Sequence, residues 1–302
     1  MQSISLNDSV NVVEGKILAR PSKLIKTPYV CDLQLINSNQ EQEQTEQEEQ
    51  QQVLAHTPSL GCNGMVDKEA TVISVKRNSG KCDYGVICSK QEEKGHTYLV
   101  GVDPSLAEKF AGEILISDKL TGFKAKQHTL KTQQTYDDCR FDYCGLTTDN
   151  KPFICEIKNV SIAVYENESP KVLSKMDFSD RDYDSKIAVF PTGYKKSKAV
   201  THSERALKHT NTLRKIMETR ENVICMILFI VQRDDITHFE VSNGDPVYKE
   251  ALKKANESGV IVRAISVKWV ENNANTNDND NDNDNDNYNI TPICGNIVKV
   301  EL

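Results

Sequence analysis

The 302-residue sequence changes its pattern at Asp103-Pro104, and this change constrains the fold more than any other feature. Before it, short β-rich runs alternate with segments that contain glycine, proline, asparagine and serine. The runs are residues 12–19, 29–36, 70–76, 84–89 and 97–102. Five short strands at this spacing predict a small barrel such as an OB-fold. Asp103-Pro104 is a typical helix start, so we expect a helix to about Leu115.

After Gly122 the pattern becomes mixed α/β. We expect strands at residues 139–146, 153–164, 224–232 and 260–267, and helices at residues 201–219 and from Asp245-Pro246 to Gly259. Thr201 and Glu204 fit a capping box at the start of the first of these helices. This order predicts a mixed sheet flanked by helices. The chain is therefore predicted to be an α/β protein of two domains, at residues 1–115 and 116–302.

Two polar runs dominate the charge balance. Residues 37–52 are rich in Gln and Glu and hold five Glu, and residues 272–288 are rich in Asn and Asp and hold five Asp. We interpret both runs as insertions in loops and assign them no role. Without these ten acidic side chains the formal charge of −7 becomes +3. The remaining chain is mildly basic, which is compatible with a polyanionic partner.

Hydropathy and cysteine usage indicate an intracellular protein, in the cytoplasm or the nucleus. No run of eighteen apolar residues is present, so no membrane span is expected. The first residues contain no secretory or transit signal pattern. Nine cysteines lie without the paired spacing of zinc sites, and their odd number suggests reduced thiols.

The chemistry is concentrated in one expected hairpin. Asp142 lies in the strand before a turn-rich segment, and Glu156 and Lys158 lie in the strand after it. Residues two apart in a strand share a face, and a hairpin folded about Asp149 brings Asp142 roughly opposite Glu156. Two carboxylates and an ammonium are then expected to meet among apolar neighbours.

Charged groups between apolar residues are costly unless they are paired or bound to a metal. Two carboxylates suit Mg²⁺, which polarises a phosphodiester and lowers the pKa of a bound water. Lys158 would then offset the negative charge of the transition state. The alternative is an edge hairpin that faces solvent, with Lys158 in a salt bridge to Glu156 or Asp142. The spacing alone does not separate these two interpretations.

Basic residues elsewhere are candidates for contacts with nucleic acid. Arg205, Lys208, His209 and Lys215 follow one stripe of the expected helix, and Lys195, Lys196 and Lys198 precede it. This stripe is either a phosphate-contacting face or an ordinary solvated one. Neither His202 nor His209 has a third ligand at metal spacing.

Arg20 and Lys23, near Tyr29, are either a nucleic-acid contact on the expected barrel or ordinary surface. Gln232-Arg233, at the end of an apolar strand, is either part of a site or a simple strand terminus.

Several motifs occur in the order found in the sugar fermentation stimulation (SfsA) family. Residues 140–143 and 156–161 resemble the SR-x-DF and (I/V)E(I/V)K-(S/N)V-(T/S) segments of that family. Further similar segments are residues 20–23, 29–32, 56–59, 63–65, 188–191, 228–233 and 245–248. The chain thus resembles a eukaryote-like SfsA protein with low-complexity insertions, and the resemblance covers nearly its whole length.

The resemblance implies an N-terminal OB-like barrel and a C-terminal PD-(D/E)xK restriction-endonuclease-like domain that bind DNA without strong sequence preference. It implies that Asp142 and Glu156 ligate Mg²⁺ and that Asp142, Glu156 and Lys158 are catalytic. It also implies nucleic-acid contacts from Arg205, Lys208, His209, Arg20 and Lys23.

Two departures from the family pattern concern activity. Residues 123–135, where the family often has a further Glu, contain no acidic residue, and Thr192 follows Pro191 where the family has Asp. The sequence therefore leaves two functions open. One is a DNA-binding protein with metal-dependent nuclease activity, and the other is an inactive DNA-binding or regulatory protein linked to sugar metabolism. A third, a structural adaptor, requires the Asp142–Glu156–Lys158 group to be coincidental.

Overall fold

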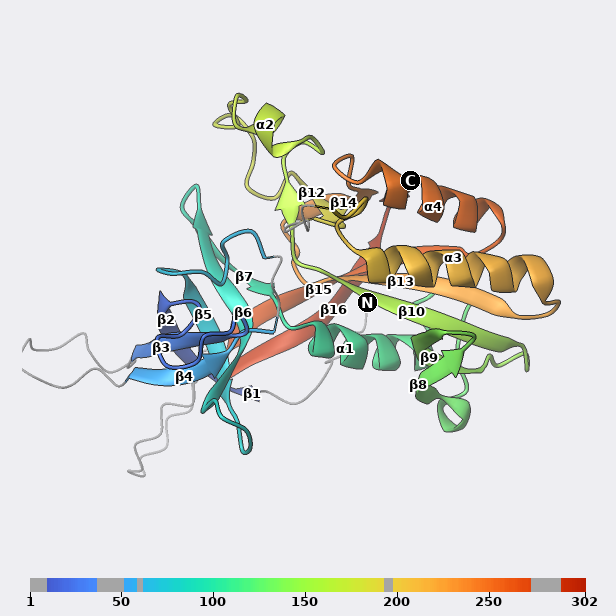
Figure 1. Cartoon of the computed structure of the whole chain (residues 1–302), viewed down its shortest axis with the longest axis horizontal. Helices are drawn as coiled ribbons and strands as arrows, with labels where there is room; N and C mark the ends of the chain where they lie inside the picture. The colour runs from blue at the N-terminus through green and yellow to red at the C-terminus, as the bar shows by residue number, and fades with distance from the viewer. Residues whose placement is uncertain (1–9, 37–51, 59–61, 193–197, 273–288) are drawn as a thin grey trace, which may run out of the picture. The chain divides into compact units, whose positions relative to one another are not determined.

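The computed structural model describes residues 10–36, 52–58, 62–192, 198–272 and 289–302 (Figure 1). The Gln/Glu and Asn/Asp runs, apart from Gln52 and Asn272, and Lys195 and Lys196 lie outside the described residues. The chain divides into two compact units. Unit 1 is Met1–Asp103 with Lys268–Cys294, and unit 2 is Pro104–Val267 with Gly295–Leu302.

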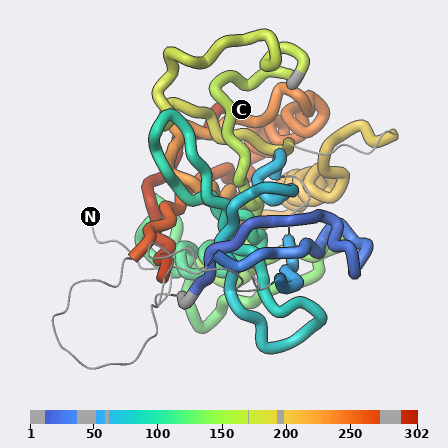
Figure 2. Tube along the Cα trace, turned by 90° about the vertical axis from the view of Figure 1, so that its left-hand side faces the viewer, coloured from blue at the N-terminus to red at the C-terminus, as the bar shows by residue number. Residues whose placement is uncertain are grey.

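Unit 1 contains a sheet in the order β4-β3-β2-β5-β6-β7. Its strands are β2 (Val13–Ala19), β3 (Val30–Ile36), β4 (Gln52–His56), β5 (Thr71–Lys76), β6 (Tyr84–Glu93) and β7 (His96–Gly101). Strand β4 also pairs in parallel with β6, which closes β4-β3-β2-β5-β6 on itself. Neighbouring strands of this unit run side by side in the blue segments of Figure 2.

The core of unit 1 is lined by small and branched side chains from these strands, including Ile17, Leu33 and Val72. Gly15 of β2 is required there, because a Cβ atom at this position would lie 2.8 Å from the carbonyl oxygen of Gln34. The five expected strands are confirmed. The sequence missed β4, which begins at the last glutamine of the Gln/Glu run.

In unit 2 the main sheet has the strand order β15-β13-β10-β9-β8. These are β8 (Lys131–Tyr136), β9 (Cys139–Leu146), β10 (Pro152–Val160), β13 (Ile224–Val231) and β15 (Ile261–Asn272). Strands β10, β13 and β15 are parallel, and β9 and β8 are antiparallel to their neighbours. Strand β15 and β16 (Asn289–Val298) are divided between the units, and β1 (Val10–Asn11) pairs with β16.

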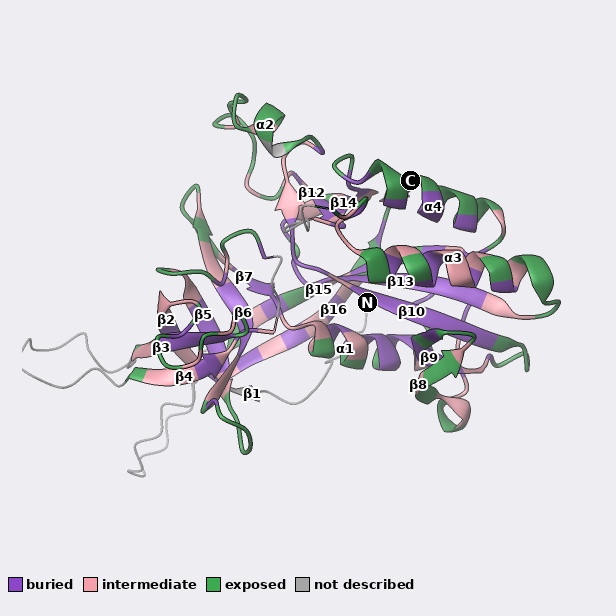
Figure 3. Ribbon diagram, viewed as in Figure 1, coloured by how far each residue is buried: buried purple, intermediate pink, exposed green. Residues whose placement is uncertain are grey.

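Three helices cover the main sheet of unit 2. They are α1 (Pro104–Ile116), α3 (Glu204–Thr219) and α4 (Pro246–Glu257), with α3 and α4 on one face and α1 on the other (Figure 1). Strands β10 and β13 are buried along most of their length, and the outer faces of α3 and α4 are exposed (Figure 3). The expected α/β class is therefore confirmed.

The expected capping box at the start of α3 is wrong. The N-cap is Ser203, whose side chain accepts a hydrogen bond from the Ala206 N–H. The hydroxyl of Thr201 instead donates to Asp245, the residue that caps α4. Thr201 therefore supports the N-cap of α4 and not that of α3.

A second, smaller sheet of unit 2 was not expected from the sequence. Its order is β11 (Ala163–Val164), β12 (Lys186–Phe190), β14 (Ile236–Val241) and β17 (Val300–Glu301). The short helix α2 (Pro170–Leu173) and a 3₁₀ turn at Gln127–Thr129 complete the unit. No helix in the described parts of the chain combines the length and apolarity that crossing a membrane requires.

Candidate active site

Glu156 and Lys158 lie on β10, an interior strand of the main sheet. Strand β10 pairs in parallel with β13 on one side and antiparallel with β9 on the other. The predicted alternative of a solvent-facing edge hairpin is therefore wrong, because β10 has neighbours on both sides and Glu156 is only 2% exposed. Its salt bridge is nevertheless present, since Lys158 Nζ donates to Glu156 Oε1.

Asp142 comes from the neighbouring strand β9. The last pair of the β9–β10 ladder is Tyr143 with Cys155, so Asp142 and Glu156 are the next residues along the two strands. Asp142 is 4% exposed, and its Oδ2 accepts a hydrogen bond of 2.7 Å from the Ile157 N–H. The hairpin thus brings Asp142, Glu156 and Lys158 together in the interior, as the spacing predicted.

His209 of α3 belongs to the same interior group. Its Nδ1 lies 2.7 Å from Glu156 Oε1, and its ring centroid lies 5.3 Å from that of Phe141. The sequence placed His209 on a basic stripe with Arg205 and Lys208. Those two side chains are exposed while His209 is buried, so the structure does not bring the three together.

Two further residues of this site have no motif to mark them. Gln133 of β8 donates from Nε2 to Asp142 Oδ1 at 3.2 Å and to Glu108 Oε2 at 3.1 Å. Glu108 is half-buried on α1 and supplies a third carboxylate. Glu108 thus brings an acidic side chain from α1 to this site, whereas residues 123–135 contain none.

Gln133 has an unusual backbone for a residue of a strand. Its φ is +54°, a left-handed conformation that is uncommon for non-glycine residues and that concentrates at functional sites. Its amide joins two carboxylates that would otherwise repel each other.

The three carboxylates differ in the direction of their pKa shifts. Burial raises the pKa of Asp142, and the negative charge of Glu156 raises it further. Burial, with Asp142 and Glu156, likewise raises the pKa of Glu108. Burial also acts to raise the pKa of Glu156, but His209 and Lys158 outweigh it and hold that pKa below its ordinary value. Neighbouring carboxyls with pKa values pushed apart are typical of functional sites.

Two buried oxygen atoms of the site have no hydrogen-bond partner among the described residues. They are Glu156 Oε2 and Gln133 Oε1. A buried polar atom without a partner is costly and needs an explanation such as a bound ion. The donor set consists of carboxylate and amide oxygens, which fits a hard divalent cation.

Other candidate residues lie away from this group. In unit 1, Arg20 donates to the carbonyl oxygens of Pro28 and Val66, so its side chain holds the loop that carries Lys23. Lys23 is exposed. In unit 2, Lys208 pairs with Asp138 at 2.7 Å, and Arg205 is exposed on the turn before it.

Gln232 and Arg233 follow β13 and are both buried. Gln232 donates to Asn159 Oδ1 at 2.7 Å, and Arg233 pairs with Asp235 at 2.6 Å. These contacts connect strand ends, and neither reaches the carboxylates of the site.

The chain is similar to known proteins along most of its length. Residues 183–273 match the family model described as "Sugar fermentation stimulation protein RE domain". A sugar fermentation stimulation protein homolog of Carboxydothermus hydrogenoformans is 24% identical over 222 residues, which cover 72% of this chain and 81% of the relative. A homolog of Magnetococcus marinus is 28% identical over 163 residues, 54% of this chain and 57% of the relative.

A solved structure of Pyrococcus furiosus SfsA in complex with Ca²⁺ has the same fold. Its TM-score to this chain is 0.67 at 17% identity, and the likeness covers 99% of this chain and 100% of that one. The fold and the site define a two-unit α/β protein with an acid–lysine group on the central strands of the second unit. The family match, the relatives and the shared fold agree, and together they support the SfsA family for this chain.

Proposed function

We propose that this chain is a DNA-binding protein of the SfsA type, and that the Asp142–Glu156–Lys158 group hydrolyses phosphodiester bonds with Mg²⁺. Unit 1 would act as an OB-like barrel and unit 2 as a PD-(D/E)xK nuclease-like domain. The observation that carries the proposal is the buried, incompletely partnered group of carboxylates beside Lys158. Family membership supports DNA as the partner, and the Ca²⁺ complex of Pyrococcus furiosus SfsA supports a divalent metal.

Asp142 and Glu156 would hold the metal, with Glu108 and the Gln133 amide beside them. Bound Mg²⁺ would supply polarisation of the phosphate and a bound water of lowered pKa. The Ile157 N–H fixes one oxygen of Asp142, so this carboxylate is oriented before any ligand arrives. Lys158 holds its ammonium at Glu156, where it would offset negative charge that develops on the phosphate oxygens.

DNA would be held mainly through its phosphates. Arg205 and Lys208 are exposed on α3, the helix whose buried face carries His209. Lys208 has an exposed partner in Asp138, an ion pair that a phosphate would replace at little cost. Contacts of this kind add affinity without reading the base sequence, which fits binding without strong sequence preference.

The test is incubation of plasmid and single-stranded DNA with the purified protein in Mg²⁺, Mn²⁺ or EDTA. We expect metal-dependent cleavage by the wild type and none by Lys158→Ala, with DNA binding retained. The matched control is Lys151→Ala, which removes an exposed lysine from the turn of the same hairpin. Binding without cleavage by the wild type would reject the hydrolase and leave the inactive DNA-binding protein. An absence of both would reject the whole proposal.

A further inference from the structure

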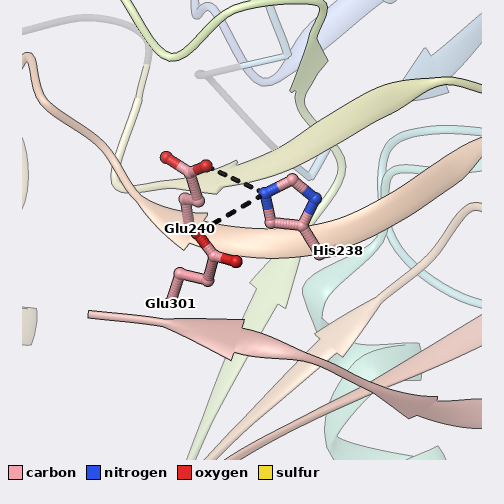
Figure 4. Close-up of side chains that lie close together, drawn as sticks. All are labelled: His238, Glu240 and Glu301. Atoms are coloured by element: carbon pink, nitrogen blue, oxygen red, sulfur yellow. Dashed lines mark hydrogen bonds and ion pairs between the residues drawn. The ribbon is translucent and has the colours of Figure 1, made fainter.

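A second group of ligand-type side chains lies on the small sheet of unit 2. His238 and Glu240 are two residues apart on β14 and therefore share a face. Glu301 of β17 is the parallel register partner of Glu240. Figure 4 shows the three side chains turned toward one another from the two strands.

One nitrogen and two oxygens meet in this group. His238 Nε2 lies 2.9 Å from Glu240 Oε1 and 4.0 Å from Glu301 Oε2. One ligand atom from each residue lies within 4.8 Å of the other two, and among the described residues no other group of three His, Cys, Asp or Glu side chains meets that condition. The side chains of His238 and Glu240 are 22% and 19% exposed, so the group is partly shielded from water yet reachable.

The hydrogen bonds around His238 indicate which ring nitrogen carries the proton. The hydroxyl of Thr237 donates to the Lys186 carbonyl oxygen, and its oxygen lies 2.8 Å from His238 Nδ1. A hydroxyl has one hydrogen, so with that hydrogen on the bond to Lys186 the hydroxyl accepts from Nδ1, and Nδ1 carries the ring proton. In a neutral ring Nε2 is then a bare lone pair, and it faces two carboxylate oxygens. Three acceptors that meet in this way require a cation or an added proton between them.

The remaining oxygens of both glutamates are already engaged. Asn167, which is buried, donates to Glu240 Oε2 at 2.6 Å and to the Val241 carbonyl oxygen at 2.9 Å. Lys299 donates to Glu301 Oε1 at 2.5 Å. Each glutamate therefore presents its other oxygen to His238. Hydrogen bonds that orient a ligand side chain through its other polar atom are typical of metal sites.

We propose that His238, Glu240 and Glu301 bind one divalent transition-metal ion, with Zn²⁺ as the fitting species. Tetrahedral zinc with bonds of about 2.0–2.1 Å places its ligand atoms roughly 3.3 Å apart, a value between the two distances measured here. An imidazole ligand disfavours Mg²⁺ and Ca²⁺, which prefer oxygen donors. This site is separate from the Asp142–Glu156 group and does not depend on the function proposed for that group.

The test is zinc titration of the full-length chain after EDTA treatment, by isothermal calorimetry with elemental analysis. The chain carries Asp142→Asn and Glu156→Gln, so that the other carboxylates do not contribute. We expect one zinc per chain, lost in His238→Ala and in Glu301→Gln. Thr237→Val, which removes the acceptor behind Nδ1, is expected to weaken binding about 10–100-fold.

His128→Ala is the matched control, because His128 is an exposed histidine of the same unit. Glu301 lies at an exposed edge, so Glu301→Gln keeps the test usable if His238→Ala does not fold. Zinc binding that persists unchanged in His238→Ala and Glu301→Gln would overturn the proposal. A starting chain that binds no zinc would overturn the proposal as well, and NMR evidence that His238 is doubly protonated at neutral pH would show that a proton fills the place of the metal.

Discussion

Unit 2 buries two groups of charged side chains, and they differ in how completely their charges are partnered. The first is the site group of Asp142, Glu156 and Lys158. The second, the closed group, consists of Lys186, Arg233 and Asp235. In the closed group Asp235 accepts from Arg233 at both oxygens and from Lys186 at one, with each distance 2.6–2.7 Å. In the site group Glu156 Oε2 is buried without a partner among the described residues.

The pKa shifts of the two aspartates show the same difference. Burial acts to raise the pKa of Asp235, but Arg233 and Lys186 outweigh it and hold that pKa below its ordinary value. The pKa of Asp142 is raised, because burial and Glu156 outweigh the Ile157 N–H and Lys158. Asp235 lies beside two cations that balance its charge, whereas Asp142 lies beside a second carboxylate, and a bound cation would offset the repulsion between them. Incomplete partnering therefore separates a candidate site from a structural ion pair.

The largest effect is expected from Asp235→Asn. Breaking a buried ion pair leaves the remaining charges unpaired and typically costs about 3–5 kcal/mol of unfolding free energy. Asp142→Asn is expected to cause no loss or a small gain, because it removes repulsion with Glu156. Urea denaturation measures both, and Asp234→Asn, an exposed neighbour, is the control. Equal losses for Asp235→Asn and Asp142→Asn would remove the distinction between the two groups.

The next effect concerns Glu108, which extends the site group to α1. If Glu108 supports the metal from beside Asp142, Glu108→Gln should lower the Mg²⁺-dependent cleavage rate about 10–100-fold. Glu113→Gln removes an exposed glutamate from the same helix and should leave the rate unchanged. Equal rates for Glu108→Gln and the wild type would exclude Glu108 from the site and limit it to the three predicted residues.

The sequence predicted the geometry of the hairpin because its signals are local. Period-two spacing and a turn at Asp149 suffice to bring Asp142 beside Glu156. Glu108 and Gln133 were missed because a helix and a strand distant in sequence bring them together, and no local pattern encodes that contact. His209 was expected on the surface because helical spacing does not say which residue of a stripe faces the sheet.

The small sheet shows the same limit for the fold. Between Val241, the last residue of β14, and Val300, the first residue of β17, lie 58 residues, and β17 has only two residues. So short a strand forms only because the sheet beside it already exists. The long buried strand β13 needed no such support and was predicted to within one residue.

A third, smaller effect is the pH dependence of stability. A carboxyl whose native pKa is raised binds its proton more tightly when folded, so its stabilisation is full at low pH. That stabilisation is lost as pH rises through the native pKa, at up to about 1.4 kcal/mol per pH unit. As the pH rises above 3.8, the ordinary pKa of Asp, the unfolding free energy of the wild type should therefore fall relative to that of Asp142→Asn.

The comparison of the wild type with Asp235→Asn should show the opposite pH dependence of the unfolding free energy. The native pKa of Asp235 is lowered, so its stabilisation is present above 3.8 and is lost as pH falls through the native pKa. Urea denaturation of the three proteins between about pH 3 and pH 7 tests both signs. Curves that diverge in the same direction would contradict the assignment of one aspartate to a site and the other to a closed ion pair.

The smallest expected effect is that of Arg205→Ala on DNA binding. Arg205 is exposed on α3, and its positive charge acts to lower the pKa of Glu108, so it lies within electrostatic range of that carboxylate. Loss of one phosphate contact should reduce the slope of log affinity against log salt by about 0.9. Fluorescence anisotropy with labelled DNA over a range of NaCl concentrations measures that slope. Lys253→Ala, on the exposed face of α4, is the charge-matched control.

An equal change in the salt dependence of both variants would mean that the basic charge of unit 2 acts diffusely. A change in Arg205→Ala alone would place a phosphate close to Arg205 and therefore near Glu108, because a cation beside acidic side chains offsets their repulsion of the polyanion.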